Sequence, residues 1–153
     1  MATYIDSIRN GVTTVFDHHA SFGHITGSLS AIESAAKDLG VRTCLCYEIS
    51  DRDGMEKSKE SVMENVDFIR YAQQDDSDML AAMMGMHASF TISDETMALC
   101  RELKPEGVGY HIHVAEGIYD LHQCLKEYSK RIVDRLYDWD ILGPVSYTHL
   151  RAH

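Results

Sequence analysis

Short apolar runs rich in β-branched residues alternate along the chain with longer segments of helical periodicity. The apolar runs predict strands at residues 11–17, 41–49, 79–87 and 108–114. A helical pattern follows each run, at residues 25–39, around residues 62–69, at 93–103 and at 118–137, with a break near Ser129. Gly40 and Ser93 have the residue types that end and begin helices. The pattern therefore predicts four consecutive strand–helix units.

Strands that alternate with helices favour a parallel α/β sheet with right-handed crossovers. Residues 79–84 are apolar without interruption, as expected for a parallel strand buried on both faces. Four such units fit either an open, flavodoxin-like sheet or half of a (β/α)8 barrel, and periodicity does not separate the two. No glycine-rich phosphate loop follows the first predicted strand, which disfavours a nucleotide-binding doubly wound sheet.

The composition narrows the possible partners and the compartment. The chain has 153 residues, of which 44% are hydrophobic, as in one globular domain. It has 24 acidic and 14 basic residues and a net charge of -10, with no basic stripe, so we expect no nucleic-acid partner. No apolar run reaches the ~18 residues that a membrane span needs. Four cysteines without an export signal predict reduced thiols and a cytoplasmic location.

Histidines and one carboxylate gather at the predicted carboxyl ends of strands. His87 ends the third predicted strand, His111 and His113 end the fourth, and Glu116 follows. Ligands of parallel α/β proteins bind at these strand ends, and residues two apart on a strand face the same side. Imidazoles beside a carboxylate suit Zn²⁺ or Fe²⁺ and a proton shuttle for water. Any single one of these histidines also fits an ordinary polar residue at a strand end.

Other reactive side chains favour structural interpretations. His18 and His19 are adjacent at the end of the first predicted strand, so they face opposite sides and cannot both bind a ligand on one face. Cys44 and Cys46 share a strand face, but two small buried side chains explain them better than a metal site does. The acidic loop at residues 51–54 lacks the later acid that a calcium loop requires.

Three segments of the chain resemble the amidohydrolase superfamily, in particular its deaminases and chlorohydrolases. They are residues 11–21 (GVTTVFDHHAS), 85–93 (GMHASFTIS) and 109–116 (GYHIHVAE). Residues 45–52 (LCYEISDR) are most similar to aminohydrolases associated with selenium metabolism. The resemblance extends from about Tyr4 to Pro144.

This resemblance implies a partial (β/α)8 barrel of about four β/α units, whose predicted strands would be barrel strands two to five. It also implies hydrolysis of a C–N bond, as in deamination, or of a C–Cl bond of a small nitrogen heterocycle. Water is activated in this family by one or two divalent metal ions, here zinc or iron. By resemblance, His113 would be a metal ligand, Glu116 the catalytic acid and base, and His87 a substrate contact. His111, which shares a strand face with His113, is also expected to bind substrate.

The resemblance further implies that the metal site is incomplete in this chain. The His-x-His pair of the family's first strand, the histidine of its sixth and the aspartate of its eighth have no counterpart. We therefore expect residues 1–144 to form a partial barrel domain that is inactive alone. Residues 145–153 depart from the family pattern and are expected to be a non-native tail, so His149 is not counted as a ligand. Their alternation nevertheless allows a short strand beside the fourth.

Two alternatives remain open at this stage. A cyclic amidase of the hydantoinase or dihydroorotase kind would hold two metals through a carboxylated lysine, but no predicted strand carries a lysine. A half-barrel binding module without chemistry is the other alternative. The sequence leaves the oligomeric state open, and a homo-oligomeric parent is compatible with it.

Overall fold

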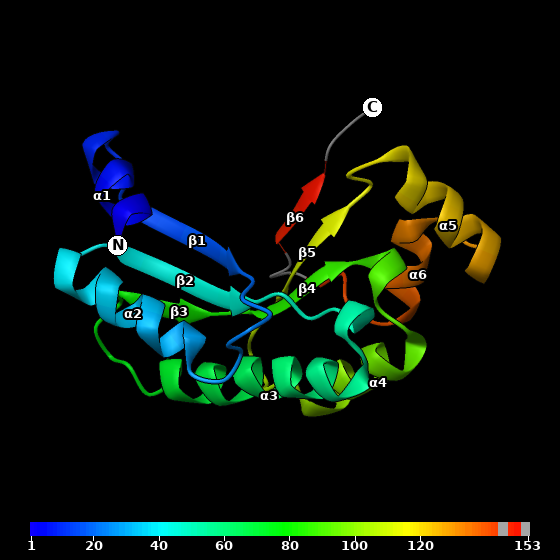
Figure 1. Ribbon diagram of the computed structural model, residues 1–153, viewed down its shortest axis with the longest axis horizontal. Helices are drawn as coiled ribbons and strands as arrows, with labels where there is room; N and C mark the ends of the chain where they lie inside the picture. The colour runs from blue at the N-terminus through cyan, green and yellow to red at the C-terminus, as the bar shows by residue number, and fades with distance from the viewer. Residues whose placement is uncertain (144–146, 151–153) are drawn as a thin grey trace.

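The computed structural model describes residues 1–143 and 147–150 (Figure 1). The helices are α1 (Ala2–Arg9), α2 (Ser28–Leu39), α3 (Met55–Ala72), α4 (Asp94–Leu103), α5 (Ile118–Tyr128) and α6 (Ile132–Asp138), with short 3₁₀ turns η1 (Asp51–Asp53) and η2 (Ser89–Thr91). The strands are β1 (Thr14–His19), β2 (Arg42–Tyr47), β3 (Leu80–Ala82), β4 (Met84–Ala88), β5 (Tyr110–Val114) and β6 (Tyr147–Leu150). Among the residues described, none of the helices is both long and apolar enough to cross a membrane.

Every strand pair is parallel, and the strands follow one another in chain order. They form two three-stranded groups, β1-β2-β3 and β4-β5-β6. The expected strand at residues 79–87 is therefore interrupted at Met83, with its first half paired to β2 and its second half to β5. The two groups remain joined, because the N–H of Met83 donates to Leu45 O (3.1 Å) and the N–H of Ile49 donates to Gly85 O (3.3 Å). The predicted parallel sheet in sequence order is confirmed.

Alternate residues of the strands point to opposite faces of this layer. Leu45 and Tyr47 pack with Leu29 and Phe68 of the helices. Met84 and Met86 of β4 and the even-numbered residues of β5 enter the main apolar core. In Figure 1, helices α2, α3 and α4 lie together on one side of the strands. The opposite side, here called the inner face, carries Phe16, a residue that is 53% exposed. This one-sided covering is the arrangement expected for part of a barrel wall.

Two elements begin later than expected because a glycine with positive φ precedes each of them. Gly11 has φ 75°, so the chain is still turning there and β1 begins later than predicted. Gly27 has φ 81°, which delays the start of α2 to Ser28. The predicted end of that helix at Gly40 and the break at Ser129 are confirmed, since both residues adopt left-handed conformations. Ser93 caps α4 as predicted, because its hydroxyl accepts from the N–H of Thr96 (3.3 Å).

Part of the expected tail forms a strand in the structure. Residues 147–150 form β6, which pairs with β5 so that His149 lies opposite His113 in the register. This is the short strand beside the fourth predicted strand that the alternation of apolar and polar residues in the tail allowed. Residues 144–146 and 151–153 lie outside the described residues. The domain boundary at residue 144 and the non-native origin of the tail remain predictions.

Candidate active site

Because side chains alternate between the two faces of a strand, residues of β1, β2, β4 and β5 come together on the inner face. His18 of β1 and Cys46 of β2 are direct register partners, and His111 and His113 of β5 follow on the other side of β4. His19 lies on the opposite face, where its ring packs against Tyr47 at 5.8 Å between centroids. The expectation that the adjacent pair cannot share one face is confirmed.

His18 lies at the centre of this group. Its ring centroid is 4.5 Å from that of His111 and 4.7 Å from that of His113. Its Nδ1 is 3.8 Å from Cys46 Sγ, and its Nε2 is 3.8 Å from Glu48 Oε2. The side chain is only 8% exposed, and Nε2 has no hydrogen-bond partner within the described part of the chain. A buried, unsatisfied nitrogen that faces further donors is what an ion-binding position requires.

Burial and neighbouring rings keep His18 uncharged. Burial is the main cause that lowers the pKa of His18 to about 3, and the nearby His111, His113 and His87 lower it further. The imidazole is therefore neutral at neutral pH and has a lone pair available for a metal ion. Burial has the opposite effect on the pKa of the Cys46 thiol, which it raises well above the usual range. Without an ion, this sulfur remains protonated.

Glu48 is held in place from outside the cluster. Its Oε1 lies 2.5 Å from Nη2 of Arg52, and Nε of Arg52 donates to Ser50 Oγ (2.8 Å). The other carboxylate oxygen faces His18. A fixed carboxylate of this kind supplies a negative oxygen ligand at the edge of the histidine group.

His87 and His113 lie at the same end of their strands, as predicted. Their ring centroids are 6.0 Å apart. Nδ1 of His87 lies 2.8 Å from Thr91 Oγ1, and that hydroxyl donates to Ala88 O (3.1 Å). Since the hydroxyl has only one proton, it accepts from Nδ1, so Nε2 of His87 is the acceptor nitrogen. Burial is the main cause that lowers the pKa of His87 below its usual value.

Glu116 follows β5 in an exposed turn beside His87. Ala115 has φ 54°, and its N–H donates to the buried carboxylate of Asp120 (3.0 Å), which holds this turn against the start of α5. The negative charges of Glu48 and Glu116 oppose the fall in the pKa of His87, so both carboxylates lie within electrostatic range of that ring. Glu116, the predicted acid, and His113, the predicted metal ligand on β5, therefore lie at the same end of the sheet.

The donor atoms fall into two groups that could each hold a metal ion. One group is His18, Glu48 and His113, and the other is His18, Cys46 and His111. Within each group, the potential ligand atoms all lie within 4.8 Å of one another. Nitrogen and carboxylate oxygen suit Zn²⁺ or Fe²⁺, so the first group, which contains the predicted ligand His113, fits a divalent ion.

Sequence comparison decides the family. Residues 4–149 match the amidohydrolase family. The chain belongs to the amidohydrolase family. Over 141 residues this amidohydrolase chain is 30% identical to 5'-deoxyadenosine deaminase of Methanosarcina barkeri, with 92% of the chain and 31% of that protein covered. It is 24% identical to 5-methylthioadenosine/S-adenosylhomocysteine deaminase 2 of Archaeoglobus fulgidus, covering 100% of the chain and 35% of that protein. The chain thus spans about a third of the length of these curated relatives.

A solved structure confirms the fold of this amidohydrolase chain. The zinc complex of atrazine chlorohydrolase from Arthrobacter aurescens superposes with a TM-score of 0.81 at 18% identity, covering 96% of the chain and 35% of that structure. The predicted fold class, a partial (β/α)8 barrel, is confirmed. The closer resemblance to selenium-associated aminohydrolases remains a prediction.

The sequence analysis identified one half of this amidohydrolase site and missed the other. His87, His113 and Glu116 are brought together as predicted, whereas His111 lies deeper, is 6% exposed and faces His18. The structure tests none of the four assigned roles. His18, Cys46 and Glu48 were not predicted as site residues. Their shared strand phase was the available signal, because positions 46 and 48 alternate with the buried Leu45 and Tyr47.

Proposed function

We propose that the protein carrying this chain is a metal-dependent aminohydrolase that deaminates a nitrogen heterocycle. The observation that carries the proposal is the meeting of His87, His113 and Glu116 at one end of β4 and β5. Two curated relatives are named deaminases, one of them at 30% identity. Hydrolysis of a C–Cl bond is the weaker candidate, because its support is a likeness of fold at 18% identity.

His113 is the proposed metal ligand, with Glu48 and His18 beside it on the inner face. A divalent ion, zinc or iron, supplies Lewis-acid activation of water when bound. Glu116, which is exposed just beyond the end of β5, takes a proton from the attacking water and returns it to the departing nitrogen. A carboxylate suits this exchange because it is a base when ionised and an acid once it has taken up the proton.

His87 is the proposed substrate contact. Its Nδ1 is engaged by Thr91, so the ring is fixed and Nε2 is left as a hydrogen-bond acceptor. An amino group or ring N–H of a heterocycle is the complementary donor. His111 was expected to share this role, but its burial beneath the other rings favours His87.

The remaining assignments rest on composition and resemblance. The four cysteines are free and buried, which supports the proposed cytoplasmic location. The net charge of -10 supports the absence of a nucleic-acid partner. A homo-oligomeric parent is left as a prediction. A cyclic amidase or a non-catalytic half barrel would be favoured if the deamination assay below gave no turnover.

The test is the substitution Glu116→Gln in the complete protein that carries this chain, assayed for ammonia release from amino-substituted purines and triazines. Because glutamine cannot carry the proton, we expect kcat to fall about 10²- to 10⁴-fold with the bound metal retained. Glu102→Gln, an exposed substitution on α4, is the matched control and should leave kcat unchanged. Equal activity of the Glu116 variant and the wild type would refute the proposed role.

A further inference from the structure

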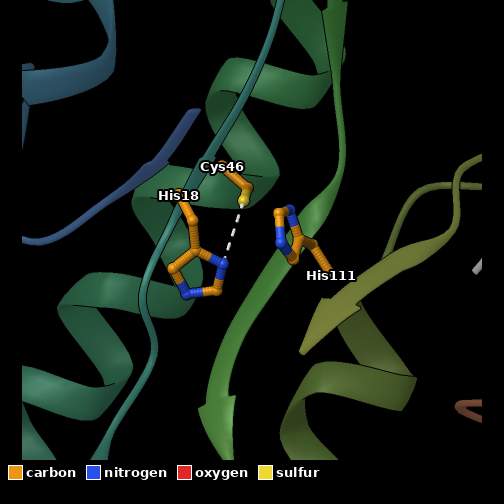
Figure 2. A group of neighbouring side chains, drawn as sticks. All are labelled: His18, Cys46 and His111. Carbon is orange, nitrogen blue, oxygen red and sulfur yellow. Dashed lines mark hydrogen bonds between the residues drawn. The ribbon is translucent and has the colours of Figure 1, made fainter. Parts of the chain in front are cut away.

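A second group of potential ligands lies one layer below the candidate active site on the inner face. It consists of His18, Cys46 and His111, which come from three different strands (Figure 2). Figure 2 shows the rings of His18 and His111 on either side of the Cys46 sulfur. Cys46 and His111 precede Glu48 and His113 by two residues each, so they point the same way but lie closer to the amino ends of the strands.

Gly85 is the reason that these side chains can meet. It is the register partner of His111, and β4 lies between β2 and β5 at this level. A Cβ atom at Gly85 would lie 2.9 Å from Cys46 Cβ and would also overlap the carbonyl oxygen of Tyr47. Because glycine has no side chain, the inner face is open here, and His111 reaches across β4 toward Cys46 and His18.

The distances suit a tetrahedral ion. His18 Nδ1 and Cys46 Sγ are 3.8 Å apart, and all three potential ligand atoms lie within 4.8 Å of one another. Zn–N and Zn–S bonds at a tetrahedral angle place nitrogen and sulfur about 3.5 Å apart. Closure of the side chains would therefore bring these three donors into bonding distance and leave the fourth position of the ion to water or another ligand. Cys46 is 1% exposed and lies against Cys44 and Met83, so the wall below it is apolar.

We propose that His18, Cys46 and His111 form a second divalent-metal site, which takes Zn²⁺ and accepts Co²⁺ as a substitute. Two imidazole nitrogens and one thiolate form a donor set that binds zinc in preference to magnesium or calcium. On binding, the S–H bond of Cys46 breaks, its proton leaves to solvent and the sulfur bonds the metal, with no change of oxidation state. The site shares His18 with the group of His18, Glu48 and His113 but uses no part of Glu116, His87 or His113, and it does not depend on the proposed function.

The test is a Co²⁺ titration of the full 153-residue chain, followed by absorption spectroscopy. Thiolate bound to cobalt gives a charge-transfer band in the near ultraviolet, which a site of nitrogen and oxygen ligands does not give. We expect this band in the wild type, saturating at one equivalent and abolished by competing Zn²⁺. Cys46→Ala should remove it, and His111→Asn should weaken Co²⁺ binding at least about a hundredfold, since even loss of an outer-shell partner costs 10- to 100-fold.

Cys44→Ala is the matched control, because Cys44 is also buried on this face of β2 and belongs to neither donor group. It should keep the band, and so should His113→Asn, because His113 belongs only to the group of His18, Glu48 and His113. Circular dichroism of each variant shows that the fold is retained, and Cys46→Ser replaces Cys46→Ala if the alanine variant unfolds. A wild type without the band, or a band that survives in a folded Cys46 variant, would overturn the proposal.

Discussion

The backbone at Gly85 approaches β2 so closely that no side chain fits there. The nearest atoms to a Cβ at this position belong to the backbone of Tyr47 and to Cys46, and neither is the flexible end of a side chain. Glycine at this residue therefore serves two purposes. It lets the two groups of strands join, and it leaves space on the inner face for the histidines.

Gly85→Ala is expected to lower the free energy of unfolding by about 1–3 kcal/mol or more, because the added methyl group forces the backbone of β2 to move. Urea denaturation of the purified chain measures the change. Gly23→Ala is the matched control, since a Cβ there meets no atom within 4 Å and φ is not positive. The control should be neutral or slightly stabilising. Equal losses in both variants would show that the close approach at Gly85 is unimportant.

At the scale of elements, the loop after β2 is tied to the start of α4 by one carboxylate. Asp51 of η1 accepts from the N–H of Ser93 (2.7 Å) and from the hydroxyl of Thr96 (2.7 Å). Burial alone would raise the pKa of Asp51, but hydrogen bonds from Ser58, Ser93 and Thr96 outweigh burial and lower it. The contact fixes the loop that carries Arg52 and thereby Glu48.

Asp51→Asn should reduce the free energy of unfolding by about 1–2 kcal/mol at pH 7, because an amide accepts these two hydrogen bonds less well than a carboxylate. The ionised group has a lower pKa in the folded state than its unfolded value of about 3.9. Its stabilising contribution is therefore complete above that value and is lost as the pH falls through the depressed pKa. Urea denaturation at several pH values measures both effects, with the exposed Asp53→Asn as control. A difference that does not diminish as the pH falls below about 3.9 would contradict this account.

Helix α1 shows why some elements escaped the sequence analysis. It is only eight residues long, and one of them, Tyr4, is buried. Tyr4 packs with Ala36 and Val41, and its hydroxyl lies 2.8 Å from Thr43 Oγ1. These partners are distant in sequence, and eight residues are fewer than the window of about 11–18 over which helical periodicity is read, so the pattern did not indicate the helix. The interruption at Met83 was missed for a similar reason, since an unbroken apolar run says nothing of a change of pairing partner.

At the scale of the whole molecule, the parallel strand order and the grouping of His87, His113 and Glu116 were predictable. Both follow from alternating strands and helices and from the rule that strand ends share one edge of a sheet. The central position of His18 was not predictable, because it depends on how close β1 and β5 come across the inner face. Cys46 was interpreted as a packing residue for the same reason, since its histidine partners belong to other strands.

The most direct measurement of the central claim is a zinc-edge anomalous difference map of the complete protein that carries this chain, crystallised with zinc. The account predicts an ion about 2.0–2.1 Å from a ring nitrogen of His113, on the inner face beside Glu116. An ion at His18, Cys46 and His111 alone would support the second site and contradict the proposed catalytic one. Zinc-loaded, active protein with no ion at His113 would contradict the proposed active site.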